Sequence, residues 1–233
     1  MEPKTKTFYG RRKGRALSKE RAGILVEGMK EFAIGLGSRP RAVEAEDRKC
    51  LQFLFALGKK NTLEVGYGSG EHLIEYAKKR PDEFFVGTEV FENGNAAMVK
   101  ALRDTGLTNV RIFPEDVNML LPHLPGGVFD QIFILYPDPW PKARHESRRM
   151  ISEERVKTFA GLLKPGGRML VASDHPIYIP HVLRVVLGSG LFEWTAKNSR
   201  DFMVEPLDWE TTRYEQKAKR EGRTPIYLEF IKK

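Results

Sequence analysis

The chain has 233 residues, of which 41% are hydrophobic and 30% charged, and this ordinary globular composition excludes a disordered or collagen-like protein. The single cysteine, Cys50, excludes an intramolecular disulfide and a cysteine-based zinc cluster. A reducing cytoplasm is therefore the expected compartment. The basic N-terminus lacks the apolar stretch of a secretory signal, and no apolar run approaches the ~20 residues of a membrane helix.

The formal net charge is +8, and the excess of basic residues is concentrated in two segments. Residues 1–21 contain eight bases and two acids, and residues 142–149 contain four bases and one acid. Clustered Lys and Arg favour a polyanionic partner, most often a nucleic acid. Charge alone leaves open that both segments are simply solvated.

In chain order, residues 1–42 read as a basic arm with a short helix near 19–34, and an acidic start predicts a helix over 44–57. Strands and helices then alternate, which predicts a mostly parallel sheet with helices on both faces. Segment 197–224 fits no clean period, and so long a loop is usually functional or disordered. The expected strands are 62–66, 84–90, 110–113, 130–136, 168–174, 192–195 and 225–232, and the expected helices are 71–80, 95–106 (ended by Gly106), 152–163 (capped by Ser152) and 181–190.

The first expected strand runs into a glycine-rich sequence, LEVGYGSGEH, which starts at Leu63. Gly66, Gly68 and Gly70 stand where a strand turns into a helix, and glycines there let the backbone approach a ligand. Their G-x-G-x-G spacing differs from the G-x-G-x-x-G of dinucleotide dehydrogenases. Taken alone, the motif also fits a tight turn that binds nothing.

Acidic residues lie in or just after the first three expected strands. Glu89 ends the second strand, roughly 20 residues after the glycines, where an acid accepts ribose hydroxyls in Rossmann folds. Asp116 follows the third strand, where an acid can bind an adenine amine, and Glu64 lies in the first. One such acid is more often a solvated turn residue, but three in register favour a ligand site.

These features resemble the class I S-adenosylmethionine methyltransferases. The glycine loop, the two acids and the LLKPGG turn that begins at Leu162 match over about residues 60–175. A sulfonium cofactor suits an acidic loop better than a pyrophosphate would, and Glu64 could help compensate its charge. The resemblance implies that S-adenosylmethionine is bound by Glu64, Gly66, Gly68, Glu89, Asp116 and Asp138.

The fourth expected strand runs into the most distinctive stretch, YPDPWPKARHESRRM, which starts at Tyr136. It resembles the PDPW-K-x-R-H-x-x-R-R signature of the tRNA (guanine-N7)-methyltransferases. ASDH from Ala172 and TTRYEQKAKREGR from Thr211 match two further segments of that family, so the resemblance covers about residues 8–233. It implies a Rossmann-like class I fold with a mostly parallel seven-stranded sheet and an antiparallel last strand. It also implies methylation of a guanosine at position 46, in the variable loop of tRNA.

The chemistry of guanine explains what such a site needs. N7 already carries an in-plane lone pair, so no general base is required, and the enzyme's task is to position that atom. Methylation leaves positive charge on the purine, which a nearby carboxylate stabilises. By resemblance Asp138 is the catalytic residue, Lys142, Asp174, Thr212 and Glu215 contact substrate, and Arg144, His145, Arg148 and Arg149 contact RNA. Trp140 could stack on the base or simply pack the loop.

The sequence also argues against three other functions. A methyltransferase acting on an exocyclic amine would carry an Asn/Asp-Pro-Pro-Tyr/Phe turn where this chain has Pro-Asp-Pro-Trp. An NAD-dependent oxidoreductase is disfavoured by the glycine spacing, and an RNA-binding module without catalysis has no use for four carboxylates near an RNA backbone.

We further expect a methyltransferase domain over 43–233 with a substrate-side insertion at 197–224. We expect no metal, no membrane association and no obligate protein partner, in a monomer or homodimer.

Overall fold

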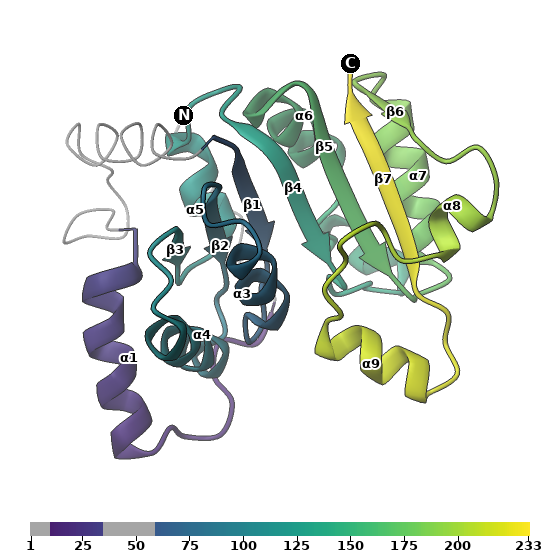
Figure 1. Cartoon of the computed structure of the whole chain (residues 1–233). Helices are drawn as coiled ribbons and strands as arrows, with labels where there is room; N and C mark the ends of the chain where they lie inside the picture. The colour runs from purple at the N-terminus through teal and green to yellow at the C-terminus, as the bar shows by residue number, and fades with distance from the viewer. Residues whose placement is uncertain (1–9, 35–58) are drawn as a thin grey trace, which may run out of the picture.

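The computed structural model describes residues 10–34 and 59–233 (Figure 1). Within them one sheet has the strand order β3-β2-β1-β4-β5-β7-β6. β1 to β5 pair in parallel, whereas β7 is antiparallel to both β5 and β6. The mostly parallel sheet with an antiparallel last strand is therefore confirmed. The strands are β1 (Asn61–Val65), β2 (Phe84–Thr88), β3 (Val110–Phe113), β4 (Phe129–Leu135), β5 (Leu163–Ser173), β6 (Phe192–Trp194) and β7 (Ile226–Lys232).

Helices connect the strands as the alternation predicts. Ser152 caps its helix by accepting a hydrogen bond from the Arg155 N–H, and Gly106 ends another in a left-handed conformation, so both helix boundaries are confirmed. The helix predicted over 44–57 lies outside the described residues. The helices are α1 (Lys19–Phe32), α3 (Glu71–Lys78), α4 (Glu92–Thr105), α5 (Val117–Leu120), η1 (Leu121–His123), η2 (Ala143–Arg148), α6 (Glu153–Leu162), α7 (Tyr178–Gly188), α8 (Arg200–Met203) and α9 (Arg213–Arg220).

Helices cover the two faces of the sheet around its central strands, as expected for parallel strands. On one face, α1, α3 and α4 pack around a core that includes Leu73, Phe85 and Met98. On the other, α5, α6 and α7 pack around a core that includes Phe129 and Phe159. Every residue of β1 and β2 is buried, so the strand ends that carry the expected ligand residues are rigidly held. None of the helices in the described ranges combines the length and apolar character needed to cross a membrane.

Two segments differ from the sequence-based expectation. β5 begins at Leu163, because Leu163 already pairs with Phe129 before a register shift, so the Pro-Gly-Gly sequence lies inside an irregular strand. Segment 197–224 contains α8 and α9 (Figure 1). α9 buries only Glu215 and Ala218, so its sequence has no apolar period by which a helix could be recognised.

The described part of the basic arm is attached to α4. The Gly14 N–H donates to the Asn93 side-chain oxygen at 2.9 Å, and the Asn93 amide donates back to the Arg15 carbonyl at 2.8 Å. α1 then packs on α4 so closely that a Cβ on Gly28 would lie 1.9 Å from a methyl of Val99. These contacts hold residues 10–15 near the carboxyl ends of the strands.

Candidate active site

A cleft of about 660 Å³ opens at the carboxyl ends of four neighbouring strands. Its walls come from the segments that follow β1, β2, β3 and β4, and α9 lies at the same edge of the sheet (Figure 1). Open α/β sheets bind ligands in this crevice because the loops that follow parallel strands converge there. The cleft therefore occupies the place where the sequence predicted a ligand.

The glycine loop and Glu89 form one wall of this cleft. Gly66 and Gly68 have φ values of 77° and 61°, a left-handed conformation that favours glycine. One Glu89 carboxylate oxygen accepts the Gly68 N–H at 2.9 Å, and the other accepts the N–H groups of Val90 and Phe91 at 2.8 and 2.9 Å. Burial nevertheless raises the pKa of Glu89 above its usual value. The carboxylate is thus held in place by backbone donors and would gain from a nearby cation.

Asp116 lies at the base of the cleft and caps α5. Its carboxylate accepts hydrogen bonds from the backbone and side-chain N–H groups of Asn118 at 2.9 and 2.8 Å. The Asn118 oxygen in turn accepts from Arg155 at 3.1 Å. The sequence analysis missed Arg155, which lines the cleft and is 9% exposed. A base in an otherwise acidic first helical turn is the signal that could have identified it.

Asp138 stands on the loop that leaves β4. Tyr136 and Trp140 on either side of it have φ values of 50° and 41°, a conformation that residues other than glycine rarely adopt. Among the described residues, no hydrogen bond or ion pair engages the Asp138 carboxylate. The cleft walls desolvate this carboxylate in part and raise its pKa. Asp138 therefore presents to the cleft, on a strained loop, an acid that has no partner among residues 10–34 and 59–233.

Arg149 supports that loop from inside the protein. Its side chain is 6% exposed, and its guanidinium donates to the carbonyls of Pro139 at 3.1 Å and Trp140 at 3.2 Å. A buried guanidinium with carbonyl partners fixes the backbone around Asp138. The structure therefore does not bring Arg149 to the surface, where the resemblance had implied an RNA contact.

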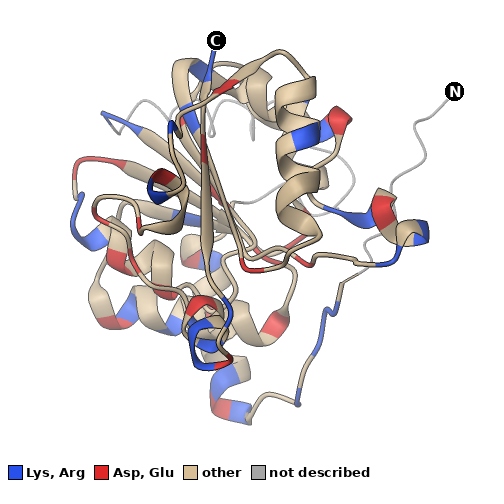
Figure 2. Cartoon of the chain, turned by 90° about the vertical axis from the view of Figure 1, so that its right-hand side faces the viewer, with Lys and Arg blue, Asp and Glu red and all other residues tan. Residues whose placement is uncertain are grey.

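The other basic residues of this segment face outward. The Arg148 guanidinium lies 5.0 Å from the centre of the Trp140 ring and lines the cleft, while Lys142 and Arg144 are exposed. Partial desolvation and the neighbouring cations lower the pKa of His145, which favours the neutral ring at pH 7. Arg11 of the arm also lines the cleft. In Figure 2 the ribbon of the arm and that of the 142–149 segment, both blue at their basic residues, lie on the same side of the molecule.

The residues expected to contact substrate from the last third of the chain lie behind the cleft lining. Thr212 caps α9 by accepting the Glu215 N–H at 3.0 Å. Glu215 is fully buried, and its carboxylate accepts from Trp209 at 2.6 Å and from the Tyr227 hydroxyl at 2.8 Å. Asp174 forms a 2.6 Å ion pair with Arg223.

Glu64 is likewise buried beneath the glycine loop. Its carboxylate lies 2.7 Å from the His72 ring nitrogen, and both side chains are 2% exposed. It does not line the cleft. Of the predicted site residues, the cleft lining brings together Gly66, Gly68, Glu89, Asp116, Asp138 and Arg148.

α9 contributes two side chains that the sequence analysis did not single out. Arg213 hydrogen-bonds to Ser69 and pairs with Glu71 at 3.1 Å, which fixes the first turn of α9 against the glycine loop. Tyr214 lines the cleft, and a Cβ on Gly68 would lie 3.5 Å from its ring. The signal for both was their place in the TTRYE segment.

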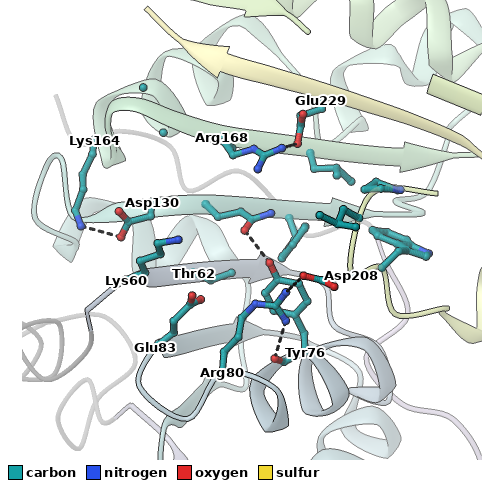
Figure 3. A pocket seen from close by; sticks show the side chains of 18 of the residues that line it. Lys60, Thr62, Tyr76, Arg80, Glu83, Asp130, Lys164, Arg168, Asp208 and Glu229 are labelled. Carbon is teal, nitrogen blue, oxygen red and sulfur yellow. Dashed lines mark hydrogen bonds and ion pairs between the residues drawn. The ribbon is translucent and has the colours of Figure 1, made fainter. Parts of the chain in front are cut away.

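A second hollow, of about 480 Å³, lies on the sheet face near the amino ends of β1, β4 and β5 (Figure 3). Charged residues in its walls pair with one another: Lys164 lies 2.7 Å from Asp130, and Arg80 lies 3.2 Å from Asp208. Arg168 pairs with Glu229 in the same way. The hollow lacks the loops that follow parallel strands, where ligands bind in this fold class. In the part of the chain that the structure describes, no group of acidic, His or Cys side chains is arranged to hold a metal ion.

Comparison with known proteins relates this cleft to a family. The family model described as "Putative methyltransferase" matches residues 58–228. A protein named tRNA (guanine-N(7)-)-methyltransferase from Rhizobium johnstonii is 40% identical over 229 residues, which cover 98% of this chain and 95% of that protein. A protein of the same name from Rhodospirillum rubrum is 40% identical over 224 residues, covering 96% of this chain and 86% of that protein.

Solved structures establish the fold independently. The crystal structure of the 16S rRNA methyltransferase KamB has a TM-score of 0.60 at 17% identity and covers 86% of this chain and 98% of that chain. An antibiotic-related methyltransferase has a TM-score of 0.54 at 14% identity and covers 79% and 92%. At these identities the likeness shows the class I methyltransferase fold alone.

Proposed function

The chain belongs to the tRNA (guanine-N7)-methyltransferase family, and on that premise we propose that it methylates N7 of a guanosine in tRNA, with S-adenosylmethionine as methyl donor. The observation that carries the proposal is the carboxylate of Asp138, which lines the same cleft as the glycine loop and Glu89 and has no partner in the described part of the chain. This carboxylate faces the space where an acceptor base would meet the donor.

The described residues fit S-adenosylmethionine. A Cβ on Gly66 would meet no atom within 4 Å, so the backbone there is open to a ligand. Gly94 of α4 instead packs against the glycine loop, because a Cβ there would lie 2.2 Å from the Gly68 carbonyl oxygen. When bound, the cofactor supplies a methyl group that its positive sulfonium makes electrophilic. Glu89 would accept from its ribose and Asp116 from its adenine amine. Their negative charges favour a cation and oppose a pyrophosphate.

Asp138 would act on the acceptor base. Methylation at N7 would leave a positive charge on the purine. A fixed carboxylate stabilises that charge without taking a proton, because N7 attacks with a lone pair that is already free. The carbonyl contacts of Arg149 hold the Asp138 loop in its strained conformation at Tyr136 and Trp140. Positioning and charge stabilisation thus account for the reaction.

We assign the remaining predicted residues to supporting and RNA-binding positions. Arg148, Arg144 and Lys142 would contact tRNA phosphates, together with Arg11, which lines the same cleft as Arg148. Thr212 and Glu215 would hold α9 on the substrate side, and Asp174 would act through Arg223. Glu64 would support the glycine loop from below through His72. The target position in the variable loop rests on the family resemblance.

The test is the identity of the methylated nucleoside. The purified chain is incubated with methyl-labelled S-adenosylmethionine and bulk tRNA, and the tRNA is digested to nucleosides and separated by chromatography. We expect label in 7-methylguanosine. Label in a guanosine or adenosine methylated at an exocyclic amine would replace the proposal with the rival methyltransferase, and no transfer to tRNA would reject it.

A further inference from the structure

Tyr214 occupies an unusual place among the aromatic residues of the cleft. Phe91, Tyr136 and Trp140 also line the cleft but are only partly exposed, whereas Tyr214 is 59% exposed. An aromatic ring in the wall of a cleft offers a flat apolar face against which a ligand can pack.

The ring is held in this exposed position by its neighbours in the chain. On one side, Arg213 contacts Ser69 and Glu71 of the glycine-loop segment. On the other, Glu215 turns into the protein and accepts from Trp209 and Tyr227. With both neighbours anchored, Tyr214 has its Cα fixed and its side chain directed into the cleft.

Tyr214 lies between two sides of the cleft. The segments after β1 to β3 form the donor side, and the Asp138 loop after β4 belongs to the acceptor side. Its ring lies next to Gly68 of the donor side. Partial burial, together with the negative charges of Glu89 and Asp138, raises the pKa of its hydroxyl, so the hydroxyl stays protonated at pH 7. Both carboxylates line the same cleft as Tyr214.

The other wall of the cleft offers less free aromatic surface. The Arg148 guanidinium lies over the Trp140 ring at 5.0 Å, and His145 meets that ring edge-on, with 5.6 Å between ring centres. Trp140 is thus engaged in packing the 142–149 loop, which favours the packing alternative for this residue.

We propose that the ring of Tyr214 is the stacking surface for the acceptor guanine after it leaves the tRNA stack. The inference rests on the proposed function and identifies how the same site would hold its base. Protein recognition of unstacked RNA bases commonly uses aromatic faces. A base stacked on Tyr214 lies between the glycine loop and Asp138, where its N7 can face the donor methyl and its developing charge can face the carboxylate.

The experiment compares Tyr214→Ala and Tyr214→Phe with Gln216→Ala, an exposed polar residue of the same helix. For each variant, kcat and KM for tRNA are measured by 7-methylguanosine formation, and the S-adenosylmethionine Kd is measured by calorimetry. We expect Tyr214→Ala to lower kcat/KM for tRNA roughly 10- to 100-fold, the effect of losing one stacked base. Tyr214→Phe keeps the ring and should stay within about threefold of wild type, and Gln216→Ala should match wild type.

The outcomes separate the inference from its premise. A Tyr214→Ala enzyme with wild-type kcat/KM, or a Tyr214→Phe enzyme as impaired as Tyr214→Ala, would overturn the stacking role. So would a loss of cofactor affinity in Tyr214→Ala equal to the loss in kcat/KM, since the ring would then cover the cofactor. A wild-type chain that forms no 7-methylguanosine would instead reject the proposed function. Because Tyr214 is exposed, the thermal midpoint of each variant should equal that of wild type.

Discussion

The two sides of the cleft are built from different kinds of contact. On the donor side, after β1 to β3, acids bind backbone N–H groups close to them in the fold, as Glu89 does with Gly68, Val90 and Phe91. On the acceptor side, after β4 and around α9, the loop is held by side chains that reach across it, as Arg149 does to Pro139 and Trp140. The Asp138 acid is left without a partner in the described residues.

This difference suggests a division of labour. A carboxylate that backbone donors already hold loses little freedom when it binds a cofactor, so the donor side favours affinity. On our proposal, a carboxylate that stands on a strained loop and has no partner among the described residues would be ready for charge that develops during the reaction, so the acceptor side would favour rate. Substitutions on the two sides should therefore change different kinetic quantities.

The largest expected effect is on turnover. Replacing Asp138 by Asn keeps the shape and removes the charge, and loss of one electrostatic group of this kind typically lowers kcat about 10²- to 10³-fold. Cofactor affinity should stay within a few-fold of wild type. Single-turnover methylation of tRNA at saturating cofactor measures the rate of methyl transfer, and calorimetry measures the cofactor affinity. Near wild-type turnover in this variant would remove Asp138 from its role and abolish the proposed difference between the two sides.

The donor side should show the opposite pattern in Glu89→Ala. Loss of a charged acceptor for two hydroxyls corresponds to about 1.5–3 kcal/mol, or roughly a 10- to 100-fold weaker S-adenosylmethionine Kd. Glu89→Gln keeps an acceptor oxygen for the backbone donors, so it controls for local unfolding of the glycine loop. Calorimetry on the folded variants gives the result, and an unchanged Kd in both would show that Glu89 does not bind the cofactor.

Arg149 and Arg148 form a matched pair that tests how the acceptor side is held. Arg149→Ala would leave the partly buried carbonyls of Pro139 and Trp140 without this donor, which we expect to cost about 1–3 kcal/mol in the free energy of unfolding. Arg148→Ala should change the free energy of unfolding by less than about 0.5 kcal/mol, as most surface substitutions do. Urea denaturation of the two variants measures the difference, and equal stabilities would mean that Arg149 does not support the Asp138 loop.

The smallest expected effect concerns RNA affinity in Arg148→Ala. One phosphate contact contributes about −0.7 to −0.9 to the slope of log affinity against log salt concentration. The slope measured for the variant should therefore be shallower by about that amount. Tyr214→Ala, which carries no charge change, serves as the control and should keep the wild-type slope. Salt titrations of tRNA binding without cofactor give both slopes, and an unchanged slope in Arg148→Ala would place its guanidinium away from the phosphates.

The donor side could be predicted from sequence and most of the acceptor side could not, for a physical reason. Gly66, Glu89 and Asp116 each follow a strand, as Asp138 of the acceptor side also does, and parallel strands bring their carboxyl ends to one edge, so the alternation of strands and helices places them together. The burial of a polar side chain leaves no such period. Glu215 is a fully buried acid in the polar helix α9.

Adjacent residues of one type show the same limit. Arg148 and Arg149 are indistinguishable in sequence, yet one lines the cleft and the other is buried against carbonyls. Which of them faces inward depends on the path of the loop from Pro139 to Arg149, and that path is fixed by long-range contacts. The sequence therefore predicted a basic surface without identifying the arginine that builds the site.

The central claim is that the acceptor atom is N7, held near Asp138 and attacking without a base. The most direct test is a tRNA with a single 7-deazaguanosine at the position that the wild-type enzyme methylates, in which a C–H group replaces N7 and the Watson–Crick edge is kept. We expect no methyl transfer to this tRNA, and we expect it to inhibit methylation of normal tRNA with a Ki close to the normal tRNA's Kd. Methylation of the 7-deaza tRNA at the normal rate would contradict the account.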